Sequence, residues 1–106
     1  MPQYFFAAAA TAGFDGCRFA KQELARGQRL FLGLNCFEPG QSQALHQHAG
    51  ADKFYLILSG NARMIVGQET RDAAAGTLVW APSGVPHGVE RALERTVMLV
   101  GMTPPP

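Results

Sequence analysis

Turn-forming residues divide most of this chain into short apolar segments. Their regular spacing limits the folds that the chain can adopt. From Arg29 onward, turns containing Gly, Pro or Asn recur about every eight to twelve residues, beginning with Glu38-Pro39-Gly40. Short strands at this spacing are typical of an antiparallel sandwich or barrel, so the sequence predicts an all-β domain. The expected strands are Arg29–Phe37, Ser42–His48, Asp52–Leu58, Ala62–Val66, Thr70–Ala73, Thr77–Ala81, His87–Glu90 and Thr96–Gly101.

The two ends of the chain follow this pattern less clearly. Residues 1–28 fit either a helical turn or a strand with a connecting loop, packed on the barrel. Residues 102–106 end in three prolines and are expected to form a frayed, disordered tail. A chain of 106 residues has no room for a second core, so we expect one domain whose barrel spans residues 29–101.

Composition and charge exclude several classes of protein. Hydrophobic residues make up 47% of the chain and charged residues 16%, so disorder caused by excess charge is excluded. The formal net charge is +1, which argues against a nucleic-acid-binding face. No apolar run approaches the length that spans a membrane. Two cysteines, Cys17 and Cys36, are too few for a disulfide scaffold, which favours a reducing, cytoplasmic location.

The three histidines are the residues with the clearest chemical meaning. His46 and His48 are two positions apart in an extended segment, so both side chains point to one face of the sheet. Two parallel imidazoles suit neighbouring coordination positions on a transition metal. An isolated pair of this kind is also common on surfaces beside a turn, and His87 is needed to favour the metal site.

The glycines, prolines and histidines around this pair have a characteristic spacing. The first stretch reads Gly40-(five residues)-His46-Gln47-His48-(four residues)-Lys53-(six residues)-Gly60. The second reads Gly76-(five residues)-Pro82-Ser83-Gly84-Val85-Pro86-His87-(three residues)-Arg91. Together they closely resemble the two signature motifs of the cupin superfamily, G-x5-H-x-H-x3,4-E-x6-G and G-x5-P-x-G-x2-H-x3-N. The resemblance covers about half of the chain.

This resemblance implies a single-domain jelly-roll β-barrel, also called a double-stranded β-helix, with one divalent metal inside it. His46, His48 and His87 match the family's three histidine ligands, and the metal would be iron, zinc, nickel or manganese. The family's turn residues are matched by Gly40, Gly60, Gly76, Pro82 and Gly84.

Lys53 stands where the cupin motif has a glutamate ligand, and a lysine ammonium cannot bind a metal. Three interpretations remain open. Three neutral histidines alone hold the metal, which then binds an anionic ligand more strongly. Alternatively, Asp52 supplies the missing carboxylate through a β-bulge, because a shift of one residue along a strand reverses its face. In the third interpretation the barrel carries no metal. Arg91, at the position of the motif's final Asn, does not affect the ligand set.

Lys53 and Tyr55 share one face of their expected strand, which makes both of them candidate catalytic residues. The ammonium would attract a carboxylate or enolate, and the phenol would donate a hydrogen bond or carry a proton. A core position for Tyr55, with its hydroxyl at the rim, is an equally good interpretation.

Fold does not determine function, so more than one function fits this sequence. The first hypothesis is a small metalloenzyme, similar to dioxygenases or isomerases, that acts on a small anionic or carbonyl compound. The alternatives are a barrel that binds or senses such a ligand without turnover, and a scaffold that has lost its metal. We also expect a homodimer with contacts through Arg29–Phe37 and Thr96–Gly101, because both segments are apolar.

Overall fold

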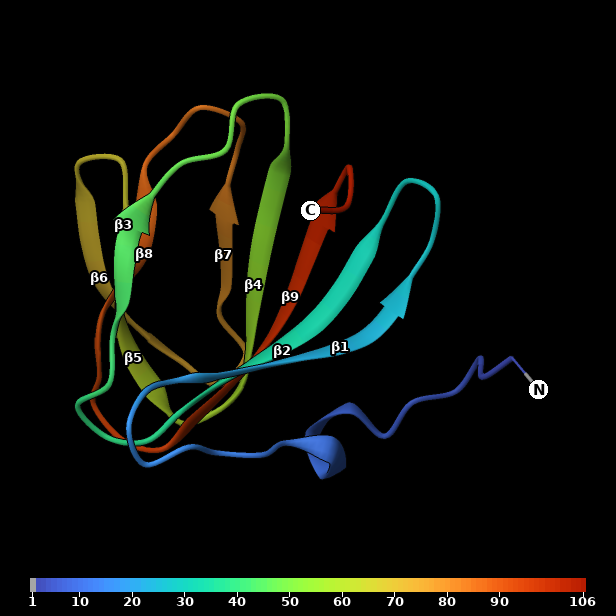
Figure 1. The fold of residues 1–106 in the computed structure, drawn as a ribbon. Coiled ribbons are helices and arrows are strands. Elements are labelled where there is room, and N and C mark those ends of the chain that lie inside the picture. Colours follow the sequence, from blue (N-terminus) through green and yellow to red (C-terminus); the bar gives the residue numbers. More distant parts are fainter. Residues whose placement is uncertain (1) are drawn as a thin grey trace.

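The computed structural model describes residues 2–106, which form two antiparallel β-sheets that face each other (Figure 1). None of the helical segments in these residues is long and apolar enough to cross a membrane. The elements within residues 2–106 are the 3-10 helix η1 (Ala8–Thr11) and the strands β1 (Ala20–Arg26), β2 (Phe31–Phe37), β3 (Gln43–His46), β4 (Asp52–Ser59), β5 (Asn61–Val66), β6 (Glu69–Ala74), β7 (Leu78–Ala81), β8 (His87–Ala92) and β9 (Thr96–Thr103).

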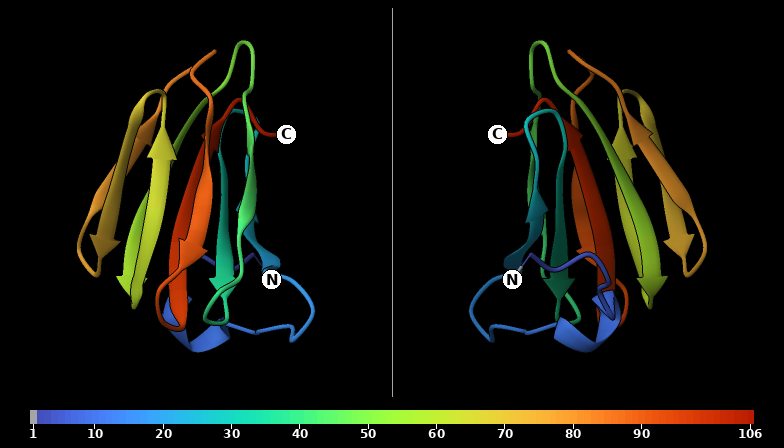
Figure 2. Two further views of the ribbon diagram at one scale, coloured as in Figure 1. Left: turned by 90° about the vertical axis from the view of Figure 1, so that its left-hand side faces the viewer. Right: turned by 90° about the vertical axis from the view of Figure 1, so that its right-hand side faces the viewer.

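The order of the strands shows that the chain winds back and forth between the two sheets. One sheet has the order β1-β2-β9-β4-β7 and the other the order β3-β8-β5-β6, with antiparallel pairing between neighbours. Strands far apart in sequence, such as β2 and β9, therefore lie side by side, as Figure 2 shows. This is the arrangement of a jelly roll, and the prediction of a single all-β domain is confirmed.

The two ends of the chain are more regular than the sequence indicates. Part of the N-terminal region forms β1, which pairs with β2 along its whole length apart from one register shift between Glu23 and Ala25. At the other end β9 continues to Thr103, two residues into the segment expected to be a tail, because it pairs there with β2 and β4. The Arg26 guanidinium also donates a hydrogen bond of 2.9 Å to the Pro106 carbonyl oxygen.

The main core lies between the two sheets. Tyr55 and Ile57 on β4 face Met64 and Val89 on the opposite sheet, and all four are nearly inaccessible to solvent. A smaller apolar cluster lies on the outer face of the five-stranded sheet. There the N-terminal segment, including Phe14, packs over Leu34, Cys36 and Val97.

The turn between β4 and β5 shows why one motif position requires glycine. Gly60 has a φ of +88°, which residues with a side chain rarely adopt. A Cβ atom there would also clash with the Arg95 carbonyl oxygen and lie 2.7 Å from the Thr96 Cα. Gly60 therefore lets the hairpin pass directly against the start of β9.

Candidate metal centre

Two paired strands and the loop after one of them bring the three histidines together. His46 on β3 lies directly opposite His87 on β8. His48 follows the end of β3, and its ring centroid is 5.1 Å from that of His46 and 5.7 Å from that of His87. The His46 and His87 ring centroids are 4.3 Å apart. The sequence prediction that these three residues form one cluster agrees with this arrangement.

Backbone hydrogen bonds orient two of the rings so that their outer nitrogens are available. His46 Nδ1 is 2.8 Å from the Ala44 carbonyl oxygen, and His87 Nδ1 is 2.9 Å from the Val85 carbonyl oxygen. A carbonyl oxygen only accepts hydrogen bonds, so Nδ1 carries the proton in both rings and Nε2 keeps its lone pair. His87 Nε2 is buried and has no hydrogen-bond partner within residues 2–106. An unpartnered buried nitrogen is costly unless another ligand engages it.

The surroundings keep all three imidazoles neutral. Burial lowers the pKa of His46, His48 and His87 below the usual value, and the positive charge of Lys53 lowers each of them further. Backbone hydrogen bonds oppose this effect at His46 and His87. Neutral imidazole is the form that binds a metal, so the cluster is ready for coordination at neutral pH.

The donor set fits a divalent transition metal. One nitrogen from each histidine lies within 4.8 Å of the others. Two nitrogens that bind one ion at about 2.1 Å each are at most about 4.2 Å apart, so the cluster is already near the required size. Three imidazoles suit the zinc, iron or nickel expected from the sequence and leave positions for water or a ligand.

Asp52 does not join this cluster, so the interpretation in which it replaces the family glutamate is wrong. Its carboxylate accepts a hydrogen bond of 2.9 Å from the backbone N–H of Ser83. Ser83 Oγ in turn accepts one from the Gly50 N–H at 2.8 Å, and the Gly84 N–H donates to the His48 carbonyl oxygen at 3.0 Å. These bonds fasten the two loops that carry His48 and His87 to each other, which is a positioning role.

Lys53 lines a cavity together with His46 and His48. Its side chain is buried, and its ammonium is 4.9 Å from the centre of the Tyr55 ring. Burial, with a further contribution from the charge of Lys21, lowers the pKa of Lys53 to about 8. The ammonium is therefore protonated at neutral pH, but it gives up its proton more readily than an ordinary lysine.

Tyr55 lies deeper in the molecule than Lys53. It is completely buried in the main core and is not among the residues that line the cavity. Its hydroxyl donates a hydrogen bond of 3.3 Å to the Gln43 Oε1, and burial raises its pKa. In this position Tyr55 orients Gln43 and supports Lys53, and does not itself contact the cavity.

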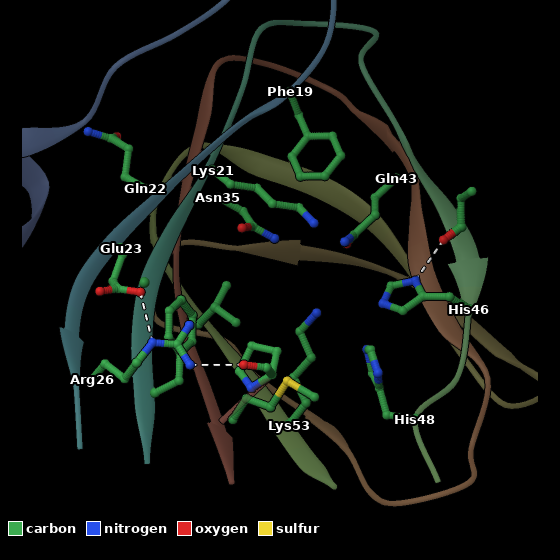
Figure 3. A pocket seen from close by; sticks show the side chains of 16 residues that line it. Phe19, Lys21, Gln22, Glu23, Arg26, Asn35, Gln43, His46, His48 and Lys53 are labelled. Atoms are coloured by element: carbon green, nitrogen blue, oxygen red, sulfur yellow. Dashed lines mark hydrogen bonds and ion pairs between the residues drawn. The ribbon is translucent and has the colours of Figure 1, made fainter. Parts of the chain in front are cut away.

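Besides Lys53, the cavity contains polar residues that the sequence analysis did not identify. It has a volume of about 580 Å³ and reaches from His46 and His48 to β1. Figure 3 shows the ammonium groups of Lys21 and Lys53 and the amide groups of Asn35 and Gln43 pointing into it. One sequence signal could have indicated Asn35, because it is a lone polar residue among the apolar residues 30–37.

Comparison with known proteins decides the family. Residues 33–101, which contain all three histidines and Lys53, match the Cupin domain family. The chain is a cupin. Because the family's glutamate ligand is Lys53 here, this cupin has a three-histidine cluster beside a buried lysine.

This cupin is also similar to individual proteins of known sequence or structure. An uncharacterized protein of Streptomyces coelicolor is 33% identical to it over 83 residues, which cover 78% of each chain. The solved structure of TT1209 from Thermus thermophilus is 33% identical, with a TM-score of 0.90 over 96% of this chain and 98% of that one. KdgF from Halomonas sp. has a TM-score of 0.85 over 100% and 96% of the two chains at 19% identity, which is a likeness of fold alone.

Proposed function

We propose that this cupin binds one divalent transition metal through His46, His48 and His87 and acts on a small anionic or carbonyl compound. The reaction class that we propose is similar to that of dioxygenases or isomerases. The observation that carries the proposal is the buried Nε2 of His87, which has no hydrogen-bond partner in residues 2–106 and faces two other neutral imidazoles. When bound, the metal supplies a Lewis acid that polarises a carbonyl or carboxylate oxygen.

The chain's own residues would bind and orient the ligand. Lys53 presents a buried positive charge to an anionic oxygen beside the histidines. With its pKa at about 8, Lys53 Nζ holds a proton at neutral pH and can release it to a developing oxyanion. The Tyr55 hydroxyl holds Gln43 by a hydrogen bond to the Gln43 Oε1. The Gln43 amide nitrogen then points into the cavity as a further hydrogen-bond donor.

Metal content tests the first half of the proposal. Protein purified without a polyhistidine tag and supplied with each candidate metal should contain about one equivalent by elemental analysis. His87→Ala should lose the metal, whereas Gln47→Ala, an exposed change between the two other ligands, should keep it. Lys53→Glu should raise metal affinity by about tenfold or more, because it replaces a repelling charge with the family's ligand. Metal well below one equivalent in the wild-type protein after supplementation contradicts the proposal.

Turnover tests the second half. Oxygen consumption and product formation are measured for metal-loaded protein with a panel of carboxylates and diketones, and with His87→Ala as the inactive control. We expect turnover of at least one compound that is lost in this variant. Recovery of every bound compound unchanged would instead support a non-catalytic binding or sensor barrel. Folded protein that binds neither metal nor ligand would support a scaffold.

A further inference from the structure

The positive charges of the cavity are not balanced by acidic side chains. The chain has only two lysines, Lys21 and Lys53, and both line the cavity. Glu23 is the acidic residue in the lining, and its carboxylate is paired with Arg26 at 3.1 Å. Within residues 2–106 neither lysine forms a salt bridge, although Arg26, Arg63, Arg71 and Arg95 all do.

Aromatic rings hold the two ammonium groups in place without neutralising them. Lys21 Nζ lies 5.6 Å from the centre of the Phe19 ring, and Lys53 Nζ lies 4.9 Å from that of Tyr55. The Phe19 ring itself stacks on Phe37, with the ring centroids 4.8 Å apart. Contacts of this kind position a cation and leave its charge available to an anion.

The two lysines occupy different parts of the cavity. Lys53 is on β4 and 7% exposed, whereas Lys21 is on β1 and exposed at the mouth. Strands β2 and β9 lie between β4 and β1 in the sheet. Both side chains nevertheless point into the same cavity, so both ammoniums act on the same space. A ligand with two separate negative groups can place one at each ammonium.

Two other residues that line the cavity, Asn35 and Gln43, carry amide groups that donate hydrogen bonds. The Gln43 Oε1 accepts a hydrogen bond from the Tyr55 hydroxyl. The amide nitrogen of Gln43 therefore points into the cavity. Asn35 on β2 lies opposite Lys21 on β1 in the strand register. Its side chain is buried and directs its amide toward the cavity. Donors in this position suit the oxygens of a carboxylate.

We propose that the cavity binds a small dicarboxylate, with one carboxylate at Lys53 beside the three histidines and the other at Lys21. This inference rests on the proposed metal-dependent function and narrows its ligand to one chemical class. A compact dianion such as phosphate fits less well, because its charge is concentrated at one point. A monocarboxylate leaves Lys21 without a partner.

Binding of succinate and acetate, with inorganic phosphate as a third probe, tests this inference. Affinities are measured by calorimetry at constant low ionic strength for wild type, Lys21→Met and Arg91→Met, each in metal-free and zinc-loaded form. The Arg91 variant removes an equal charge at an exposed position outside the cavity lining. We expect wild type to bind succinate more tightly than acetate or phosphate. Lys21→Met should weaken succinate binding by about fivefold and leave acetate unchanged, and Arg91→Met should behave as wild type.

Lysine labelling gives a second readout that does not depend on affinity. Because Lys21 and Lys53 are the only lysines, an amine-reactive reagent followed by mass spectrometry reports on the cavity without background from other lysines. Succinate should protect both residues, and acetate should protect Lys53 alone. The inference is contradicted if succinate leaves Lys21 reactive, or if Lys21→Met lowers acetate and succinate binding equally.

The same samples separate the two proposals. Elemental analysis records whether the zinc-loaded form holds the metal. Metal uptake without a Lys21-dependent preference for succinate contradicts only the dicarboxylate inference. A Lys21-dependent preference in protein that takes up no metal contradicts only the metal-dependent function.

Discussion

Lys53 is the residue at which this cupin departs most from the signature of its superfamily. A glutamate at this position would add negative charge beside the three histidines, whereas the ammonium adds positive charge. Because the side chain is buried and has no carboxylate partner in residues 2–106, the lysine is unfavourable to the folded protein when the cavity holds no anion. We propose that this position lowers the stability of the folded protein and raises its affinity for a negatively charged ligand.

Replacing Lys53 with Met should stabilise the metal-free protein at pH 7 by up to about 3 kcal/mol. The pKa of Lys53 is about 8 in the folded protein and 10.5 in the unfolded chain. The loss of folding stability caused by the buried Lys53 charge is fully present below pH 8. It disappears as the pH rises toward 10.5, because the unfolded chain still binds the proton there and the folded protein does not. Urea unfolding at pH 7 and pH 10 measures this difference.

The comparison with a surface charge makes this test specific. Arg91→Met, which removes an exposed cation, should change the free energy of unfolding by less than about 0.5 kcal/mol at either pH. A Lys53→Met protein that is less stable than wild type, or whose advantage is the same at pH 7 and pH 10, would show that Lys53 carries no such penalty.

At the level of the elements, sequence reasoning succeeds wherever turns and alternation are both clear. The strands expected from Arg29 onward lie close to their observed bounds, because glycine and proline turns mark their ends. The sequence of β1 is AKQELAR, which contains good helix formers, and it becomes a strand only through pairing with β2.

The contrast between local sequence signals and pairing of distant strands also explains which parts of the site are predictable. The three histidines belong to local spacings that the sequence displays directly. Lys21 enters the cavity only because β1 pairs with β2 in one particular register, and Gln43 only because of the register shift between Gln43 and His46. Registers of this kind depend on contacts between distant parts of the chain, which periodicity along one segment does not reveal.

The hairpin between β4 and β5 provides a prediction at this scale. Gly60→Ala should destabilise the protein by about 2–4 kcal/mol, because it adds a steric clash with Arg95 and Thr96 to the strain of a positive φ. Gly76 has a similar φ of +91°, but a Cβ atom there would have nothing within 4 Å. Gly76→Ala should therefore cost only about 1 kcal/mol. Equal losses in the two variants, measured by urea unfolding, would show that the close approach at Gly60 has no effect.

At the level of the whole molecule, the homodimer expected from the sequence stays a prediction. The segments proposed for the contact are β2 and β9, and the structure places both inside the five-stranded sheet with neighbours on each side. One of the two edge strands of this sheet is β7, where Leu78 is 62% and Trp80 is 55% exposed. An unpaired edge with exposed apolar side chains is a better candidate for contact with a second copy.

Light scattering on a sizing column tests this contact. We expect wild type to elute as a dimer and Leu78→Glu to shift toward monomer, because the carboxylate would be buried against the second copy. Leu45→Glu is the matched control, since Leu45 is 57% exposed on the other sheet. A monomeric wild type would contradict the expected dimer, and a dimer that tolerates Leu78→Glu would contradict a contact through β7.

The position of Trp80 also makes this cupin convenient to follow by intrinsic fluorescence. It is the only tryptophan of the chain, and it lies on edge strand β7 outside the cavity lining. Its indole emission should therefore respond to association with another copy or to unfolding, and remain almost unaffected when the cavity is filled. A single optical signal thus distinguishes events on the outside of the barrel from events within it.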